Sequence, residues 1–154
     1  IQNCPVSGAA TIITADDIIG AWELREWRIE YEDGKIRHPF GTDACGQILY
    51  THDYRMSAVI MQKTRTRFEQ ESVRRLTTDQ KAYAFDGYFH YSGKWLIEKN
   101  EALVHSVEFS LNPDFVGTKQ RRNAELSGGS NLVLSAQEKD NVGVIRHHFL
   151  EWQR

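Results

Sequence analysis

The sequence predicts an all-β protein, an up-and-down antiparallel barrel of eight to nine strands with one short helix covering an end. Three observations lead to this fold class. Short apolar runs recur at regular spacing between tight turns, which is typical of a barrel and not of a doubly wound sheet. Aromatic residues make up 11% of the chain and there are only three prolines, both of which favour β-structure. Polar residues also occur on the strand faces that should face inward, which indicates a lined cavity or a buried polar network.

The first elements are a short helical turn around residues 16–19 and a long strand over 20–32. Trp22 and Leu24 share one face of this strand, whereas Trp27 has the opposite parity. Because alternate residues of a strand point to opposite faces, we expect a bulge near Arg25-Glu26. Small barrels use such bends to close.

Turn residues separate the remaining strands. Asp33-Gly34 predicts a tight hairpin in which both central positions have positive φ, and Gly128-Gly129 and Asp140-Asn141 predict later turns. A charged hairpin over 98–101 and a corner at Asn112-Pro113 connect the strands in the middle of the chain. The further strands are expected at 35–38, 47–51, 56–62, 90–98, 101–111, 117–126, 131–138 and 143–152.

Residues 63–77 interrupt the strand pattern, and five of them are Lys or Arg. Such a run favours a solvated or mobile loop, but it leaves open a rim at a cavity mouth that attracts anions. Thr77 and Gln80 then have the spacing of a capping box, which predicts a helix of about ten residues through Phe85 to Tyr88. Its aromatic side chains could lay this helix over one end of the barrel.

Length and charge narrow the function classes. The 154 residues predict one domain over residues 16–154, preceded by a tail over 1–15. A formal charge of -2 gives no electrostatic case for nucleic acid or a membrane surface, and no apolar run approaches the ~20 residues of a membrane helix. The cytoplasm is favoured, with a processed secreted form left open. Cys4 and Cys45 favour two free thiols over a bridge.

The most informative stretch is 91–122, where polar residues share the inward parity of neighbouring strands. His105 alternates with Leu103 and Val107, and Arg122 and Gln120 share the parity of the apolar residues of the next strand. Tyr91 has the inward parity of the strand before. We therefore expect these side chains to meet inside the barrel, with His105 as acid and base, Arg122 binding an oxyanion and Tyr91 as a proton donor. An internal network that only fixes the strand register remains the alternative.

Further side chains are expected to line a binding cavity for a flat hydrophobic ligand. Of the adjacent residues His147 and His148 only one can face inward, and the apolar residues of like parity favour His148. A metal site with His105 lacks an apparent third ligand, so no metal or cofactor is predicted. The predicted substrate-binding residues are Gln120, Trp95, Tyr50, Trp27, Met56, Phe109 and His148. The expected partner is a hydrophobic small molecule, and a homodimer stays open.

Several segments resemble a known family. HPFGTDACGQILYTHDYRMSAVI, FHYSGKWLIEKNEALVHSVEFSLNPDFVGTKQRR and the terminal WQR are similar to the lipocalin-like domain family of small bacterial and fungal proteins. The most specific part is the run Asn-Pro-x-x-x-Gly-Thr-x-Gln-x-Arg. The opening Gly20-x-Trp22 is similar to that of lipocalins proper, in which an Arg from the last strand region stacks on the Trp, a role that would fall to Arg154. Tyr54 and Trp95 depart from the family pattern, which usually has Gly and Tyr there.

The resemblance implies a ligand-holding barrel and does not imply a single reaction. Some similar barrels of natural-product pathways isomerise, dehydrate or cyclise reactive intermediates without a cofactor. The leading hypothesis is therefore a cofactor-independent isomerase, dehydratase or cyclase that acts on a hydrophobic oxygenated, polyketide-like molecule. The alternative is a binding or carrier protein without turnover.

Overall fold

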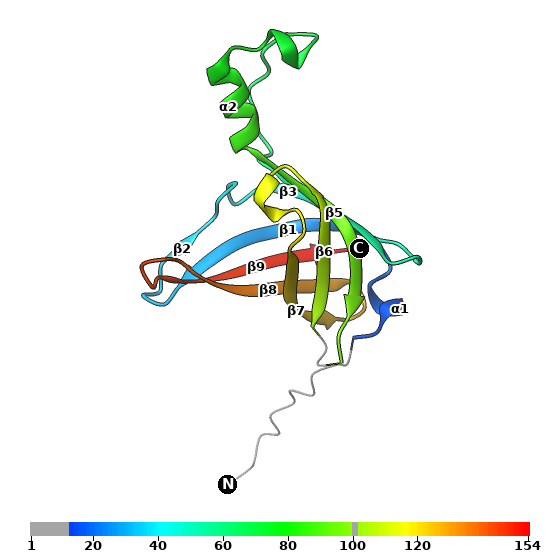
Figure 1. The fold of residues 1–154 in the computed structure, drawn as a ribbon. Helices are drawn as coiled ribbons and strands as arrows, with labels where there is room; N and C mark the ends of the chain where they lie inside the picture. The colour runs from blue at the N-terminus through cyan, green and yellow to red at the C-terminus, as the bar shows by residue number, and fades with distance from the viewer. Residues whose placement is uncertain (1–12, 100–101) are drawn as a thin grey trace.

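The computed structural model describes residues 13–99 and 102–154, which form an antiparallel barrel (Figure 1). The sheet order is β2-β1-β3-β4-β5-β6-β7-β8-β9, and pairing of β1 with β9 closes the ring, leaving β2 as an extra strand beside β1. The predicted fold class is confirmed. The elements are α1 Ala15–Ile18, β1 Gly20–Tyr31, β2 Ile36–Arg37, β3 Cys45–Tyr50, β4 Arg55–Met61, η1 Val73–Arg75, α2 Thr78–Asp86, β5 Tyr88–Ile97, β6 Leu103–Ser110, η2 Pro113–Phe115, β7 Lys119–Ser127, β8 Asn131–Lys139 and β9 Ile145–Gln153.

The end of the barrel near α1 is closed by Trp22 and Arg154. The Trp22 ring is buried, its Nε1 donates to the Ile18 carbonyl at 2.8 Å, and the Arg154 guanidinium lies 4.2 Å from the ring centroid. Arg154 also donates to the backbone carbonyls of Asp17, Ile19 and Gly129 at 2.8–3.1 Å. The expected stacking of Arg154 on Trp22 is confirmed, and the same cation joins three separate segments.

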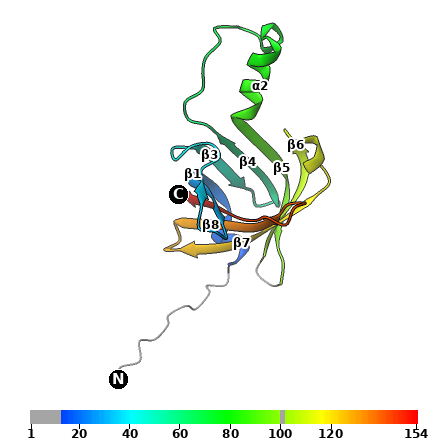
Figure 2. The same cartoon turned by 90° about the vertical axis from the view of Figure 1, so that its left-hand side faces the viewer.

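Helix α2 forms where the capping box predicts it but does not cover an end of the barrel. The Gln80 amide donates to Thr77 Oγ1 at 3.2 Å, and the Thr77 amide donates to Gln80 Oε1 at 3.0 Å. Residues 62–87 rise away from β4 and β5 in both views (Figures 1 and 2), and no residue of α2 is buried. It is α1, through the buried Ile18, that packs against the barrel core. Local capping therefore sets the helix, whereas its placement depends on tertiary contacts.

Two bulges set which side chains face inward. The register of β1 with β9 shifts between Leu24 and Glu26, as the parity of the tryptophans predicted. A second shift was not expected: Gly93 of β5 pairs with Val107, but Ser92 pairs with Phe109, so Glu108 is an extra residue in β6. The parity of β6 consequently reverses after Val107.

The hairpin at Asp33-Gly34 differs in detail from the prediction. Gly34 has φ of 87°, whereas Asp33 is not among the described residues with positive φ. The amide of Tyr31 donates to the Lys35 carbonyl at 2.9 Å, so the loop is longer than a two-residue turn. The hairpin over 98–101 and the pairing of Cys4 with Cys45 involve Asn100, Glu101 and Cys4, which lie outside the described residues.

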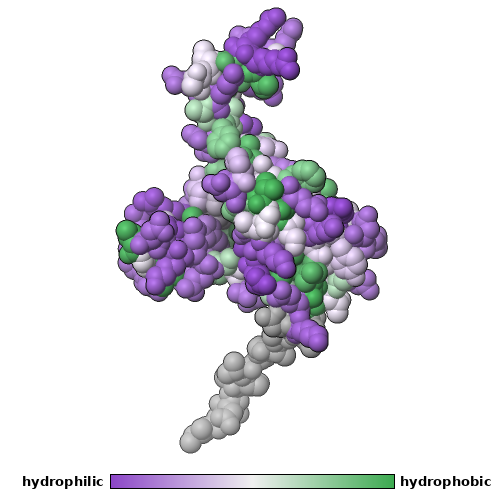
Figure 3. All heavy atoms as spheres, in the orientation of Figure 1, coloured by the Kyte–Doolittle hydropathy of each residue, from purple (hydrophilic) through white to green (hydrophobic). Residues whose placement is uncertain are grey.

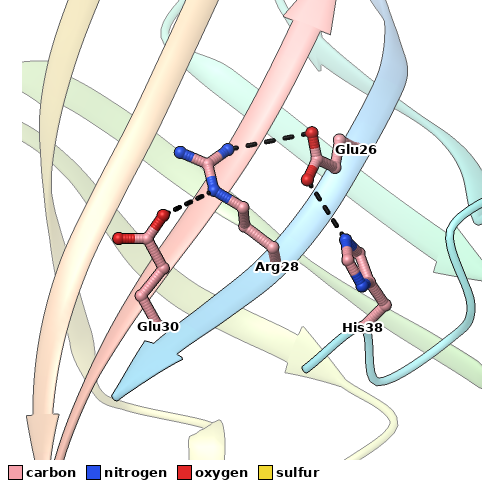
Figure 4. Close-up of polar contacts among 4 residues, drawn as sticks. All are labelled: Glu26, Arg28, Glu30 and His38. Atoms are coloured by element: carbon pink, nitrogen blue, oxygen red, sulfur yellow. Dashed lines mark hydrogen bonds and ion pairs between the residues drawn. The ribbon is translucent and has the colours of Figure 1, made fainter. Parts of the chain in front are cut away.

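A charged network lies along the outer face of β1 (Figure 4). Arg28 Nε donates to Glu30 at 2.9 Å, its Nη1 lies 3.8 Å from Glu26, and His38 Nε2 lies 3.2 Å from the other oxygen of Glu26. The Arg28 guanidinium also lies 4.5 Å from the ring centroid of Phe149 on β9. These partly exposed contacts join β1, β9 and the segment after β2, and each contributes little on its own.

Candidate functional site

The barrel contains a cavity of about 420 Å³ whose walls are mainly apolar. This volume is in the range of small-molecule sites. The polar members of the lining are Tyr91, His105, Gln120, Arg122, Gln137, Glu138 and His148. The apolar members are Trp27, Ile48, Ala58, Ile60, Phe89, Phe115, Leu134, Ala136, Leu150 and Trp152. None of residues 63–77 lines the cavity, so the structure favours the solvated loop over the rim for that basic run.

His105 lies between two phenols at the inner side of this cavity. Its Nδ1 is 2.7 Å from the Tyr91 hydroxyl of β5, and its Nε2 is 2.9 Å from the Tyr50 hydroxyl of β3 across the barrel. The imidazole is fully buried. Burial and, to a lesser extent, the nearby charge of Arg122 lower the pKa of His105 to about 3, so the ring is neutral at neutral pH.

The two phenols are also neutral. Burial raises the pKa of Tyr50 well above its usual value, and Tyr91 raises it further while Arg122 partly offsets the rise. Burial likewise raises the pKa of Tyr91, although the charge of Arg122 and a hydrogen bond from it act in the opposite direction. The three side chains therefore form a neutral chain of hydrogen bonds that begins at the cavity wall.

Arg122 brings a positive charge to the cavity without an acidic partner among the described residues. Its Nη1 donates to the Arg121 carbonyl at 3.0 Å, and its Nη2 lies 3.4 Å from Gln120 Oε1. Gln120 is in turn oriented by Thr118, to which it donates at 2.8 Å. Since Arg122 has five N–H donors, some remain available to a ligand oxygen.

A second polar group in the lining is centred on His148. Trp27 Nε1 donates to its Nδ1 at 3.4 Å, the two rings stack with centroids 6.2 Å apart, and its Nε2 lies 2.9 Å from Glu138. His148 faces inward as the parity predicted. In the part of the chain that the structure describes, no three His, Cys, Asp or Glu side chains come together as a metal site.

Four of the polar lining residues, Gln120, Arg122, Gln137 and Glu138, lie on β7 and β8 beyond the point where these two strands stop pairing. The ladder between these strands runs only from Ser127 and Asn131 to Asn123 and Ser135, whereas β8 stays paired with β9 to its end at Lys139. In Figure 1, β8, β9 and β1 continue to one side of the barrel while β7 turns away from them. Both Gln137 and its neighbour Glu138 can therefore line the cavity.

The predicted site residues fall into three groups. Tyr91, His105, Arg122, Gln120, Trp27 and His148 line the cavity. Trp95, Tyr50 and Met56 are buried in the core without lining it, and Tyr50 reaches the site only through His105. Phe109 was expected to face inward but is 65% exposed, because the bulge at Glu108 turns it outward. Hydrophobic residues gather over η2 on that face (Figure 3).

Eleven of the lining residues were not among the predicted site residues, and they include Gln137, Glu138, Phe89 and Phe115. Glu138 shares the inward parity of Leu132 and Leu134, so strict alternation along β8 could have identified it. Phe115 belongs to η2, where no periodicity indicates which way a side chain faces. It packs edge-on against Phe89 and Tyr91, with ring centroids 5.6 and 5.9 Å apart.

Comparisons with known proteins give a curated relative and several solved structures to which this chain is similar. A carrier protein of Aspergillus oryzae (strain ATCC 42149 / RIB 40), the 4'-hydroxy-3'-methoxypropiophenone carrier protein ppsC, is 24% identical over 106 residues, which is 64% of this chain and 96% of the relative. Among solved structures, a redesigned β-barrel is 12% identical with a TM-score of 0.43, covering 95% of this chain and 98% of that one. A de novo designed fluorescence-activating β-barrel is 13% identical with a TM-score of 0.40, covering 91% and 95%.

No helix of residues 13–99 and 102–154 has the length and apolar character that a bilayer-crossing helix requires. The model of the lipocalin-like domain matches residues 19–154, which includes every strand of the barrel and all of the cavity lining. The chain belongs to the lipocalin-like domain family.

Proposed function

We propose that this barrel binds a flat, mainly apolar small molecule that carries an oxygen without a proton, such as a ketone or a phenolate. The observation that carries the proposal is the Arg122 guanidinium, which lines a mainly apolar cavity together with the Tyr91 phenol and forms no ion pair with a carboxylate of residues 13–99 and 102–154. A buried or half-buried cation without a counter-charge is unfavourable, and an acceptor oxygen of a ligand would offset that cost.

The wall residues support an aromatic ligand. Trp27, Phe89 and Phe115 contribute ring surfaces to the cavity, and aromatic pairs gain free energy beyond the area that they bury. The relative from Aspergillus oryzae is named a carrier of an aryl ketone that also has a phenol group. In our proposal a similar ligand would direct its ketone oxygen to Arg122 and Tyr91 and leave its ring between the aromatic walls.

Arg122→Met is expected to weaken binding of 4'-hydroxy-3'-methoxypropiophenone by about 10- to 100-fold, because a hydrogen bond to a charged donor contributes about 1.5–3 kcal/mol. Isothermal titration calorimetry, or quenching of tryptophan fluorescence, measures the change. The matched control is Arg121→Met on the same strand: Arg121 is exposed and pairs with Glu98 at 3.2 Å on the outer face. Equal affinities of the two variants would contradict the proposal.

Proton-transfer catalysis is the second candidate, and the Tyr91-His105-Tyr50 chain is the observation that favours it. His105 cannot contact a ligand through a ring nitrogen in this arrangement, because both nitrogens already bond to phenols. The group that could exchange a proton with a ligand is therefore Tyr91. The chain ends at Tyr50, whose buried phenol resists ionisation, so net proton delivery along it is costly. An enolisation fits better, in which Tyr91 donates its proton to the ketone oxygen and later recovers it, while the Glu138 carboxylate of the same lining takes up the proton that leaves the α carbon.

Deuterium exchange separates the two functions. In D2O, a catalyst of enolisation is expected to exchange the protons α to the ketone of 4'-hydroxy-3'-methoxypropiophenone faster than buffer does, and Tyr91→Phe should remove that acceleration. A carrier binds the ketone and leaves the exchange rate unchanged, which proton NMR of the ketone detects. Acceleration that persists in Tyr91→Phe would rule out the assigned role of Tyr91.

A further inference from the structure

The hydrogen-bond chain through His105 has only one arrangement of protons that satisfies every buried donor. Tyr50 is buried, and in the part of the chain described its hydroxyl has one partner, Nε2 of His105 at 2.9 Å. A buried O–H without an acceptor costs about 1–3 kcal/mol. The Tyr50 hydroxyl therefore donates to Nε2, which must carry no proton.

The proton of the neutral imidazole then lies on Nδ1. From there it is donated to the Tyr91 oxygen at 2.7 Å. Because that oxygen already accepts from Nδ1, the Tyr91 hydroxyl has to direct its own proton elsewhere. It cannot direct it at Arg122, which has no acceptor. The remaining direction is the cavity that Tyr91 lines.

We infer that Tyr50 and His105 act as positioning residues that make the pair of Arg122 and Tyr91 in the cavity wall a pure donor site, selective for a ligand oxygen that only accepts hydrogen bonds. This inference rests on the proposed function and deepens it. Arg122 presents N–H groups and Tyr91 presents O–H, so a ketone, carboxylate or phenolate oxygen satisfies both. The opposite tautomer would leave the Tyr50 hydroxyl without an acceptor and turn a lone pair of Tyr91 toward the ligand.

The low pKa of His105 agrees with this arrangement, because a second proton on the ring would place two donors against each other at Tyr50 or force that phenol to reorient. Neither Tyr50 nor His105 exposes a polar atom that is free to touch a ligand. Their effect on binding must therefore pass through the Tyr91 hydroxyl, whose position the chain determines.

The tautomer is tested directly by long-range proton–nitrogen NMR of protein with labelled histidine at neutral pH. The His105 signals are identified by their absence in His105→Gln or, if that variant does not fold, by replacing the other five histidines in turn. We expect a proton on Nδ1 and none on Nε2. A proton on Nε2, alone or together with one on Nδ1, would overturn the inference whether or not any ligand binds.

Binding provides the second arm. The probes are 4'-hydroxy-3'-methoxypropiophenone and 2-methoxy-4-propylphenol, which has a methylene in place of the ketone. Tyr50→Phe is expected to lower the preference for the ketone by about 3- to 10-fold, the value of one buried hydrogen bond, although Tyr50 does not line the cavity. Met56→Leu, at the position paired with Tyr50, should leave the preference unchanged. An unchanged preference in Tyr50→Phe contradicts the inference, whereas failure of the wild-type protein to bind either probe contradicts only the proposed function.

Discussion

Gly93→Ala is expected to lower the free energy of unfolding by about 3 kcal/mol or more. This is the upper end of the destabilisation caused by substitutions that overpack a protein core. A Cβ at this position would lie 1.9 Å from the Ser106 carbonyl oxygen and 2.9 Å from the Glu108 amide nitrogen. Both atoms belong to the backbone of β6 at its bulge, so neither can move without breaking the ladder with β5. The backbone of β6 can therefore approach β5 this closely only because Gly93 has no side chain.

Urea denaturation followed by tryptophan fluorescence measures the loss at Gly93, with Gly87→Ala as the matched control. A Cβ at Gly87 would lie 2.7 Å from the end of the Gln62 side chain, which can rotate away, and in ordinary contact with Arg65 Nε at 3.6 Å. The backbone φ of -99° at Gly87 suits alanine. The control is expected to change stability by less than about 1 kcal/mol. If both variants unfold at the same urea concentration as the wild type, the close approach of β6 to β5 is incorrect.

His105 is expected to make the protein sensitive to acid well above the range in which carboxylates titrate. The pKa of His105 is about 3 in the folded protein, whereas the ordinary value of 6.5 applies in the unfolded chain. Between pH 6.5 and pH 3 the His105 imidazole binds a proton in the unfolded chain but not in the folded protein, so the free energy of unfolding falls as the pH decreases. The full stability is present above about pH 6.5, and the slope below it approaches 1.4 kcal/mol per pH unit from this residue alone.

The measurement is the free energy of unfolding between pH 6.5 and 4.5, a window above the titration of Asp53 and Asp140, whose pKa values are lowered by hydrogen bonds. The variant His105→Gln should lose most of the dependence of stability on pH. The control is His147→Gln, which removes the outward-facing histidine next to His148 on β9 and should keep that dependence. Equal slopes for the wild type and His105→Gln would show that His105 binds its proton as easily in the folded protein as in the unfolded one.

Local patterns account for most of the fold. The capping box predicted α2 because its two hydrogen bonds join residues three apart, and the opposite parities of Trp22 and Trp27 required the bulge in β1. The bulge at Glu108 escaped prediction because Phe109 continues the apolar alternation of β6, so the sequence contains no contradiction there. The position of α2 depends on contacts between distant segments, which periodicity does not encode.

The candidate site divides in the same way. Alternation placed His105, Arg122 and Tyr91 on the inner faces of neighbouring strands, and the structure brings all three to one cavity. It could not show that the Tyr50 hydroxyl reaches His105 from the opposite wall, because parity states which way a side chain faces and not how far it extends. The neutral state of His105 follows from that enclosure and therefore could not be predicted either.

The two ends of the segment over residues 62–87 are joined by a backbone hydrogen bond, in which the Gln62 amide donates to the Gly87 carbonyl at 2.9 Å. The two chain ends of this segment thus meet as they would in a simple hairpin, while none of its residues from 63 to 77 contributes to the cavity wall. The segment is consequently a modular insertion. Its length and composition can change, or another peptide can replace it, without altering the cavity that Arg122 and Tyr91 line.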